Sequence, residues 1–232
     1  MHLIAHRGIS AHFTENTLQA YQEALNYNVL GIEVDLHQIE NEFALFHDFE
    51  LSRLTHKQGK INQLTITELQ STVLKNGMSI PLLSDLFELV QGKCLLNLEL
   101  KYIADPGLLA EQLHHYINVY NGDVVLSSFN HVLVKQVQHE LRSVGLAHKV
   151  KTGALIAHLP YDMCNYAINL GVDLAIIDAA VVNITFVEHA FTHNLEVWCY
   201  TVNTLEDAEN LKEMGVSAVF TNDPALLGAK PI

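Results

Sequence analysis

Three observations predict that the chain folds as a single (β/α)8 barrel. Short apolar runs rich in β-formers alternate with helical patterns along the whole sequence, which is typical of a parallel sheet covered by helices. Several runs are apolar almost throughout, like strands that are buried on both faces. The chain has 232 residues and no linker or low-complexity block, a length at which α/β barrels form one domain. We therefore expect one domain over residues 1–232.

Nine runs qualify as strands, one more than a barrel of eight needs. They are Leu3–Ala5, Gly31–Leu36, Phe43–Phe46, Cys94–Leu100, Val124–Ser127, Ala154–Ala157, Leu174–Ile177, Val197–Val202 and Ala218–Thr221. The connection from Asp35 to His47 is too short for a helical crossover between parallel strands. We expect a local irregularity there, between the second and third runs. An open, doubly wound sheet is the alternative, but neither GxGxxG nor GxxxxGK[ST] is present.

Helix signals fill the spaces between the strand candidates. Apolar residues at helical spacing predict helices over Asn16–Asn28 and Asn183–His193. Thr65 begins the capping box Thr-Ile-Thr-Glu, which marks the start of another helix. A further helix begins at Thr204 and ends before Gly215, because glycine suits the left-handed position after a helix.

Composition excludes several classes of protein. Thirteen Lys and Arg against 26 Asp and Glu give a net charge of −13, which disfavours nucleic acids and anionic membranes as partners. Three cysteines without a CxxC pair exclude a disulfide scaffold and a four-cysteine zinc module. We see no signal-peptide pattern and no apolar stretch of roughly 18 residues. We expect a cytoplasmic protein without stable membrane insertion; its oligomeric state stays open.

Charged side chains stand at the ends of the first four strand candidates. Active sites of parallel α/β folds lie at the carboxyl ends of the strands, so we expect these side chains to meet. They are His6 and Arg7 after the first run, Glu33 and Asp35 in the second, His47 after the third, and Glu99 and Lys101 in the fourth.

The acidic residues of this group predict a metal site. Glu33 and Asp35 are two residues apart, so on a strand they point to the same face. Two carboxylates this close call for a cation between them, and Mg²⁺ and Ca²⁺ prefer such oxygens. Glu99 can add a third ligand, and Lys101 shares its face and can reach an anionic substrate. The alternative is a set of solvated strand ends or a salt-bridged pair.

The two histidines of this group suit proton transfer. His6 and His47 each close an apolar strand and can serve as general acid and general base near neutral pH. Arg7 offers a planar fork that matches phosphate oxygens. Adjacent residues on a regular strand point oppositely, so His6 and Arg7 can only face one site if the chain turns at Gly8.

Other candidates have less support from the sequence. Trp198 can form an apolar wall of the site or simply pack in the core. His189 and His193 lie four apart on a predicted helix and can bind zinc, but HExxH is absent and the structural alternative is favoured.

Short motifs covering nearly the whole chain follow one another in a familiar order. They are His6-Arg7-Gly8, Glu15-Asn16-Thr17, Gly31-Ile32-Glu33-Val34-Asp35, His47-Asp48, Ile80-Pro81-Leu82-Leu83, Asn97-Leu98-Glu99-Leu100-Lys101, Leu126-Ser127-Ser128-Phe129, Trp198 through Asn203, and Phe220-Thr221-Asn222-Asp223-Pro224. In these motifs the sequence resembles the glycerophosphodiester phosphodiesterases. It departs from their pattern at Thr14, at Glu40-Asn41-Glu42 and at Asn222, which affects loop shape and head-group preference.

The resemblance implies a phospholipase-C-like TIM barrel that hydrolyses glycerophosphodiesters to sn-glycerol 3-phosphate and an alcohol, using one divalent cation, Mg²⁺ or Ca²⁺. It implies the following roles: His6 and His47 as the acid/base pair, Glu33, Asp35 and Glu99 as metal ligands, Arg7 and Lys101 as phosphate contacts, and Trp198 as a substrate-side aromatic. Two rivals stay open. One is a phospholipase-D-like lyase that acts on choline lysophospholipids and leaves a cyclic phosphate. The other is a barrel that only binds phosphorylated ligands.

Overall fold

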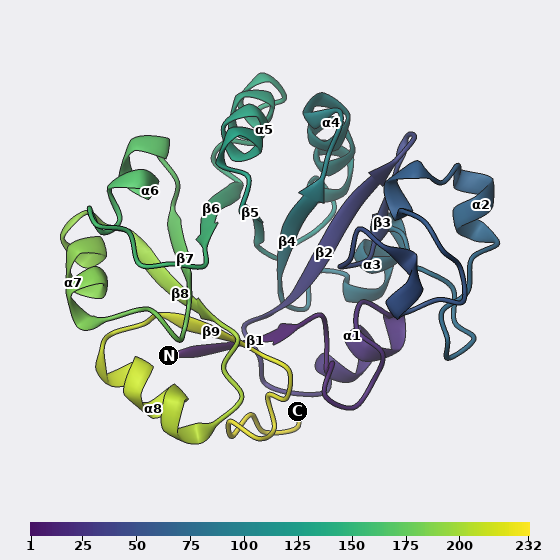
Figure 1. Ribbon diagram of the computed structural model, residues 1–232. Coiled ribbons are helices and arrows are strands. Elements are labelled where there is room, and N and C mark those ends of the chain that lie inside the picture. The colour runs from purple at the N-terminus through teal and green to yellow at the C-terminus, as the bar shows by residue number, and fades with distance from the viewer.

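Eight parallel strands close into a barrel in the computed structural model, which describes residues 1–232 (Figure 1). The strands pair in the order β1-β9-β8-β7-β6-β5-β4-β2, and β1 also pairs with β2 to close the ring. This closure confirms the (β/α)8 barrel and excludes the open sheet. The strands are β1 (His2–His6), β2 (Gly31–Ile39), β4 (Leu95–Tyr102), β5 (Val124–Ser128), β6 (Val150–Ile156), β7 (Leu174–Asp178), β8 (Glu196–Tyr200) and β9 (Ala218–Thr221).

Helices surround this barrel (Figure 1). Seven of them connect consecutive barrel strands, and no helix follows β9. These seven are α1 (Leu18–Ala24), α3 (Leu83–Val90), α4 (Pro106–Ile117), α5 (His131–Ser143), α6 (Asn165–Leu170), α7 (Ile184–Thr192) and α8 (Leu205–Glu213). The predicted ends of α8 are confirmed: Thr204 caps its start, and Gly215, just past its C-cap, has a φ of +92°.

The expected irregularity is a β-hairpin. Strand β3 (Glu42–Leu45) runs antiparallel to β2 and stays outside the barrel. Two short 3₁₀ turns and helix α2 (Ile66–Gln70) follow it. The capping box at Thr65 is confirmed, because Thr65 and Glu68 cap each other at the start of α2. A hairpin forms here because so short a connection can return the chain only in the antiparallel direction.

Inward-facing residues of the barrel form two layers of opposite character. The lower layer is apolar and includes Ile4, Val125, Ile176, Trp198 and Phe220. The upper layer, nearer the carboxyl ends of the strands, carries charged groups. Two larger apolar clusters, of 28 and 19 buried residues, fill the space between the strands and the outer helices. The interior is thus a packed core whose polar groups face one end, and this end holds the site.

Helix α1 is shorter than the sequence predicted. It begins only at Leu18, because Thr17 is the N-cap and accepts a hydrogen bond from the Ala20 backbone N–H. Asn16 takes a left-handed conformation, with a φ of +54°. Its side chain is buried and joins the charged layer of the barrel.

Candidate active site

All seven ionisable residues named from the strand ends meet at the carboxyl end of the barrel. The strand register explains this meeting, since His6 pairs with Glu33 across β1 and β2, and Asp35 pairs with Glu99 across β2 and β4. A cavity of about 250 Å³ opens among them. Its lining consists of His6, Arg7, Glu33, His47, Asn97, Glu99, Lys101, Phe129, Leu155, Tyr200, Thr201 and Phe220.

A turn directly after β1 brings Arg7 into the same site as His6. Arg7 and Gly8 both have left-handed backbones, with φ of +59° and +81°. Gly8 also lies against α1, where a Cβ atom would come within 2.6 Å of the Ala20 carbonyl carbon. Only glycine fits there without strain. The turn places Arg7 Nε 3.1 Å from Asp35 Oδ2, which confirms the bend that the sequence required at Gly8.

Three buried carboxylates form a candidate cation site. Glu33, Asp35 and Glu99 each present one oxygen within 4.8 Å of the others. Asp35 is wholly buried and lies 3.0 Å from Lys101 Nζ. Oxygen Oε1 of Glu33 is buried without a hydrogen-bond partner. Buried polar atoms rarely lack a partner, and an oxygen-rich cluster of this kind suits Mg²⁺ or Ca²⁺. The residues present therefore fit a hard divalent cation.

The electrostatics of this cluster are uneven. Burial, followed by the charges of Asp35 and Glu99, raises the pKa of Glu33 well above its usual value. Burial and Asp35 likewise raise the pKa of Glu99. Burial would also raise the pKa of Asp35, but Lys101 and Arg7 outweigh it and hold that pKa below its ordinary range. Without a cation, Asp35 thus ionises most readily of the three, and Glu33 takes up a proton most readily.

The two histidines have different partners. His6 Nδ1 lies 2.7 Å from Asn222 Oδ1, and its Nε2 lies 3.9 Å from Glu33 Oε2. Burial and the charge of Arg7 lower the pKa of His6 to about 4. His47 Nδ1 lies 2.7 Å from Asp48 Oδ1. Burial lowers the pKa of His47 too, although the bond to Asp48 opposes this shift.

Trp198 does not line the cavity, and the structure places it in the core, the alternative to a substrate-side aromatic that the sequence left open. Its side chain is 2% exposed and packs in the lower, apolar layer against Phe220, with ring centroids 5.8 Å apart. Tyr200 lies two residues further along β8 on the same inward face, one layer nearer the mouth, and lines the cavity. Phe129 meets Tyr200 edge to face, with centroids 5.7 Å apart. The aromatic side chains that line the cavity are therefore Tyr200, Phe129 and Phe220.

Comparison with known proteins agrees with this geometry. The model of the glycerophosphoryl diester phosphodiesterase family matches residues 6–226. The chain belongs to this family. It is accordingly a phosphoric diester hydrolase.

Individual relatives in this family are similar to the chain over nearly their full length. A glycerophosphodiester phosphodiesterase of Caldanaerobacter subterraneus is 29% identical to this chain. The matched region covers 97% of this chain and 95% of the relative. A glycerophosphodiester phosphodiesterase of Bacillus altitudinis is 28% identical, and the matched region covers 96% of this chain and 94% of the relative. Among solved structures, an Oleispira antarctica phosphodiesterase in complex with the product sn-glycerol-3-phosphate is 22% identical. The two structures superpose with a TM-score of 0.86, and the matched region covers 98% of this chain and 95% of the Oleispira antarctica chain.

Several residues of the site had no role assigned to them from the sequence. Asn16 donates a hydrogen bond to Asp35 Oδ2 at 2.7 Å and accepts one from Tyr21. Asn222 and Asp48 hold the two histidines. Asn16, Asp48, Asn222 and Tyr200 all lie inside the matched motifs, so the motifs carried the signal. The motifs alone gave no reason to choose these four residues, because each residue acts through a contact that only the fold creates.

We expect cation affinity to rise with pH. A cation held by these residues would bind the ionised carboxylate, and burial and Asp35 raise the pKa of Glu33, which favours its protonated form in the metal-free protein. Binding must release this proton, so the apparent Kd should fall as pH rises and level off above the metal-free pKa of Glu33. Calorimetric titration with Mg²⁺ at a series of pH values measures this. In Glu33→Gln the slope should flatten; an unchanged slope would contradict the assignment.

Trp198 and Tyr200 provide a matched pair of substitutions. Trp198→Ala empties a fully buried position and should cost about 3–5 kcal/mol of stability, while KM for a diester substrate stays within about twofold for the folded fraction. Tyr200→Ala should instead raise KM, because Tyr200 lines the cavity. Urea denaturation and steady-state kinetics on both variants test this. A raised KM in Trp198→Ala alone would restore the original prediction.

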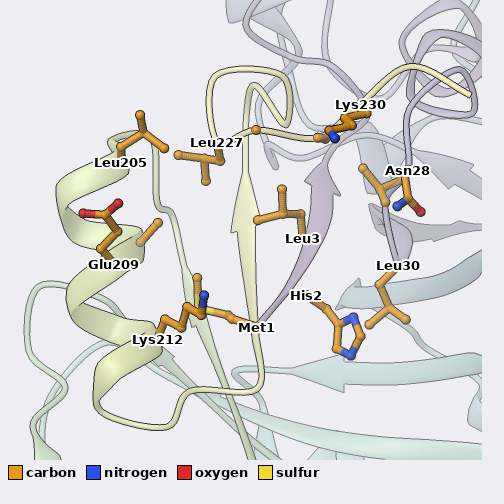
Figure 2. Close-up of a pocket in the computed structure, with 14 residues that line it drawn as sticks. Met1, His2, Leu3, Asn28, Leu30, Leu205, Glu209, Lys212, Leu227 and Lys230 are labelled. Atoms are coloured by element: carbon orange, nitrogen blue, oxygen red, sulfur yellow. The ribbon is translucent and has the colours of Figure 1, made fainter.

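A larger cavity, of about 850 Å³, lies outside the barrel, between β1, α8 and the C-terminal segment. Figure 2 shows Leu3 of β1 facing Leu227, with Glu209 and Lys212 of α8 at one side and Lys230 at the other. None of the residues that converge at the catalytic end line it. Size therefore does not identify the active site in this protein. None of the helices is both long and apolar enough to span a membrane.

Proposed function

We propose that the protein hydrolyses glycerophosphodiesters to sn-glycerol 3-phosphate and an alcohol, with one divalent cation, Mg²⁺ or Ca²⁺. The observation that carries the proposal is one cavity lined by two carboxylates, two imidazoles and two cationic side chains, with the buried carboxylate of Asp35 beside Glu33 and Glu99. The names of the relatives support this substrate class. The product bound in the Oleispira antarctica neighbour also supports it.

Each charged group has a distinct task in this proposal. Glu33, Asp35 and Glu99 would hold the cation, which supplies Lewis-acid stabilisation of charge on the phosphodiester. Arg7 and Lys101 line the cavity and add positive charge toward the same phosphoryl oxygens. Because the protein as a whole carries −13, these local cations are what make the cavity attractive to an anion.

The partners of the two histidines support different roles for them. His6 is held by a neutral amide, Asn222, and its low pKa, caused by burial and Arg7, keeps the ring unprotonated and able to accept a proton. His47 is held by a carboxylate, Asp48, whose hydrogen bond opposes the lowering of the His47 pKa by burial and so favours the protonated imidazole more than Asn222 does at His6. We assign His6 as the general base and His47 as the general acid that protonates the leaving alcohol.

The attacking group is either water or the glycerol hydroxyl of the substrate itself. In the first case His6 takes a proton from water, the phosphorus–oxygen bond to the alcohol breaks, and His47 supplies the proton to the departing oxygen. In the second case the same two transfers produce a cyclic phosphate, which water then opens. The lyase alternative stops at the cyclic phosphate. Product analysis separates these routes.

A release assay tests the proposal. Chelator-stripped protein is incubated with glycerophosphocholine, with and without added Mg²⁺ or Ca²⁺, and glycerol 3-phosphate is measured. We expect release only with a cation. Accumulation of cyclic phosphate from lysophosphatidylcholine would favour the lyase. Binding of glycerophosphocholine without turnover under either cation would favour a phosphoryl-binding barrel. The one-domain span of residues 1–232 and the cytoplasmic location stay predictions.

A further inference from the structure

Arg53 connects two carboxylates that lie on different loops beside the cavity. It ends a short 3₁₀ turn (Leu51–Arg53) in the segment after β3. Its Nη2 donates hydrogen bonds to Asp48 Oδ1 at 3.0 Å and to Glu15 Oε1 at 2.7 Å. Its Nη1 donates to Glu15 Oε2 at 2.9 Å, and its Nε donates to Asp48 Oδ2. The planar guanidinium thus holds each carboxylate through both of its oxygens, the strongest geometry for such a pair.

The imidazole of His47 depends on this arrangement. His47 follows β3, which runs outside the barrel. Its backbone is held, because the neighbouring Phe46 N–H donates to the Asp35 carbonyl oxygen at 3.0 Å. Its ring makes one hydrogen bond, between Nδ1 and Asp48 Oδ1. Arg53 and His47 are the only groups that donate to the Asp48 carboxylate. Loss of Arg53 would therefore loosen Asp48 and the imidazole while the backbone stays in place.

Glu15 connects Arg53 to the interior of the barrel. Glu15 Oε1 accepts a hydrogen bond from Arg7 Nη1 at 2.9 Å. Arg7 Nε in turn lies 3.1 Å from Oδ2 of Asp35, which is wholly buried on β2. Contacts between opposite charges thus run without a break from β2 to the carboxylate that holds His47. The members in order are Asp35, Arg7, Glu15, Arg53 and Asp48.

Arg53 belongs to a network and differs from an ordinary surface ion pair. Its side chain is 46% exposed, and an isolated pair at such exposure contributes little. Its partners Glu15 and Asp48 are only 16% and 22% exposed. Burial would raise the pKa of Glu15, but the hydrogen bonds from Arg53 and the charge of Arg7 outweigh it and lower that pKa. Lys75 Nζ donates to the Arg53 carbonyl oxygen at 2.8 Å, which holds the turn itself.

We propose that Arg53 is a positioning residue of the active site, which fixes Asp48 to the barrel through Glu15 and so orients the His47 imidazole toward the cavity. This role rests on the proposed function, in which His47 is the general acid. Arg53 does not line the cavity, so it acts only through its partners. Its fork is required as well as its charge, because the ammonium group of lysine cannot hold two carboxylates through both of their oxygens.

A double-mutant cycle tests the connection to His47. Arg53→Ala should lower kcat for glycerophosphocholine by about 10²-fold, because a misplacement of about 1 Å can cost this much. Arg53→Lys should recover only part of the loss. In the His47→Ala background Arg53→Ala should cost almost nothing more, since residues that act as a unit have non-additive effects. Equal losses in both backgrounds, or wild-type kcat in Arg53→Lys, would overturn the proposal.

Lys151→Ala is the matched control for these variants. Lys151 is 53% exposed and pairs with Glu196 at 2.8 Å, at the amino ends of β6 and β8 and away from the cavity. This substitution also breaks an exposed ion pair, so it should keep the wild-type kcat. Urea denaturation of Arg53→Ala and Lys151→Ala should show that both variants fold.

A measurement without substrate separates this inference from the proposed function. In ¹⁵N-labelled protein the Nδ1 proton of His47, protected by its bond to Asp48, should give a ring signal that is lost in His47→Ala. We expect Arg53→Ala to broaden or remove this signal through exchange with water, and Lys151→Ala to retain it. An unchanged signal in Arg53→Ala, or no signal in the wild type, would overturn the positioning role. Loss of the signal in Arg53→Ala, with a wild type that releases no glycerol 3-phosphate, would support the positioning of His47 and contradict only the proposed function.

Discussion

Replacing either His6 or His47 by alanine is expected to lower kcat for glycerophosphocholine by roughly 10²–10⁴-fold, the usual contribution of general acid–base catalysis. Both rings reach the cavity beside the carboxylate cluster. Their side chains contribute little to the apolar core, so both variants should unfold at nearly the wild-type urea concentration. Steady-state kinetics with saturating cation provide the measurement.

The choice of leaving group separates the two roles. A glycerophosphodiester of p-nitrophenol releases an anion that needs no protonation. His47→Ala should therefore recover most of its loss on this substrate if His47 is the acid. His6→Ala should stay impaired on both substrates, because activation of the nucleophile is still required. The reverse pattern would exchange the two assignments, and wild-type kcat in both variants would remove the histidines from the mechanism.

The second large effect is expected from Asp35→Asn, which should destabilise the metal-free protein by roughly 3 kcal/mol, near the lower end for breaking a buried ion pair. The Asp35 carboxylate lies 3.0 Å from Lys101 Nζ and 3.1 Å from Arg7 Nε, all within the barrel. Neutralising it leaves two partly buried cations with less compensation. The loss stays at the lower end because Glu99 still contacts Lys101 and Glu15 still contacts Arg7. Urea denaturation in the presence of chelator measures it.

Glu33→Gln is the matched control for this substitution. Burial and the neighbouring carboxylates raise the pKa of Glu33, which favours the neutral form of this residue in the metal-free protein. Glutamine resembles this protonated acid, and the metal-free stability should change by less than about 1 kcal/mol. Both variants should nevertheless bind Mg²⁺ poorly and lose activity. Equal destabilisation by both substitutions would show that Glu33 is ionised without metal.

The periodicity of two along a strand explains why most of the site could be predicted. It placed Glu33 with Asp35 and Glu99 with Lys101 on common faces, and the parallel register then brought these faces together. The same rule could not distinguish Trp198 from Tyr200. Both face inward, and they differ only in depth along the barrel axis, which depends on how far each strand is staggered.

Other residues of the site are defined by hydrogen bonds between positions that lie far apart in the sequence, so the sequence alone did not identify them. Asn222 reaches His6 across 216 positions, because β9 happens to close against β1. The sequence predicted Asn16 as the first residue of a helix. In the structure Thr17 is the N-cap of α1, and the Asn16 side chain instead donates a hydrogen bond to Asp35. The hairpin after β2 was foreseeable as an irregularity from its length alone. Its antiparallel pairing required the structure.

The pairing of β1 with β9 also bears on when the enzyme becomes active during its synthesis. His6 leaves the ribosome well before Asn222, which holds its imidazole and lies 216 residues further along the chain. Domains are synthesised from the N-terminus and fold as units. A nascent chain that already contains the carboxylates, both histidines and Lys101 would still lack the final strand and the residue that orients His6. The order of synthesis thus delays a complete catalytic centre until the barrel can close.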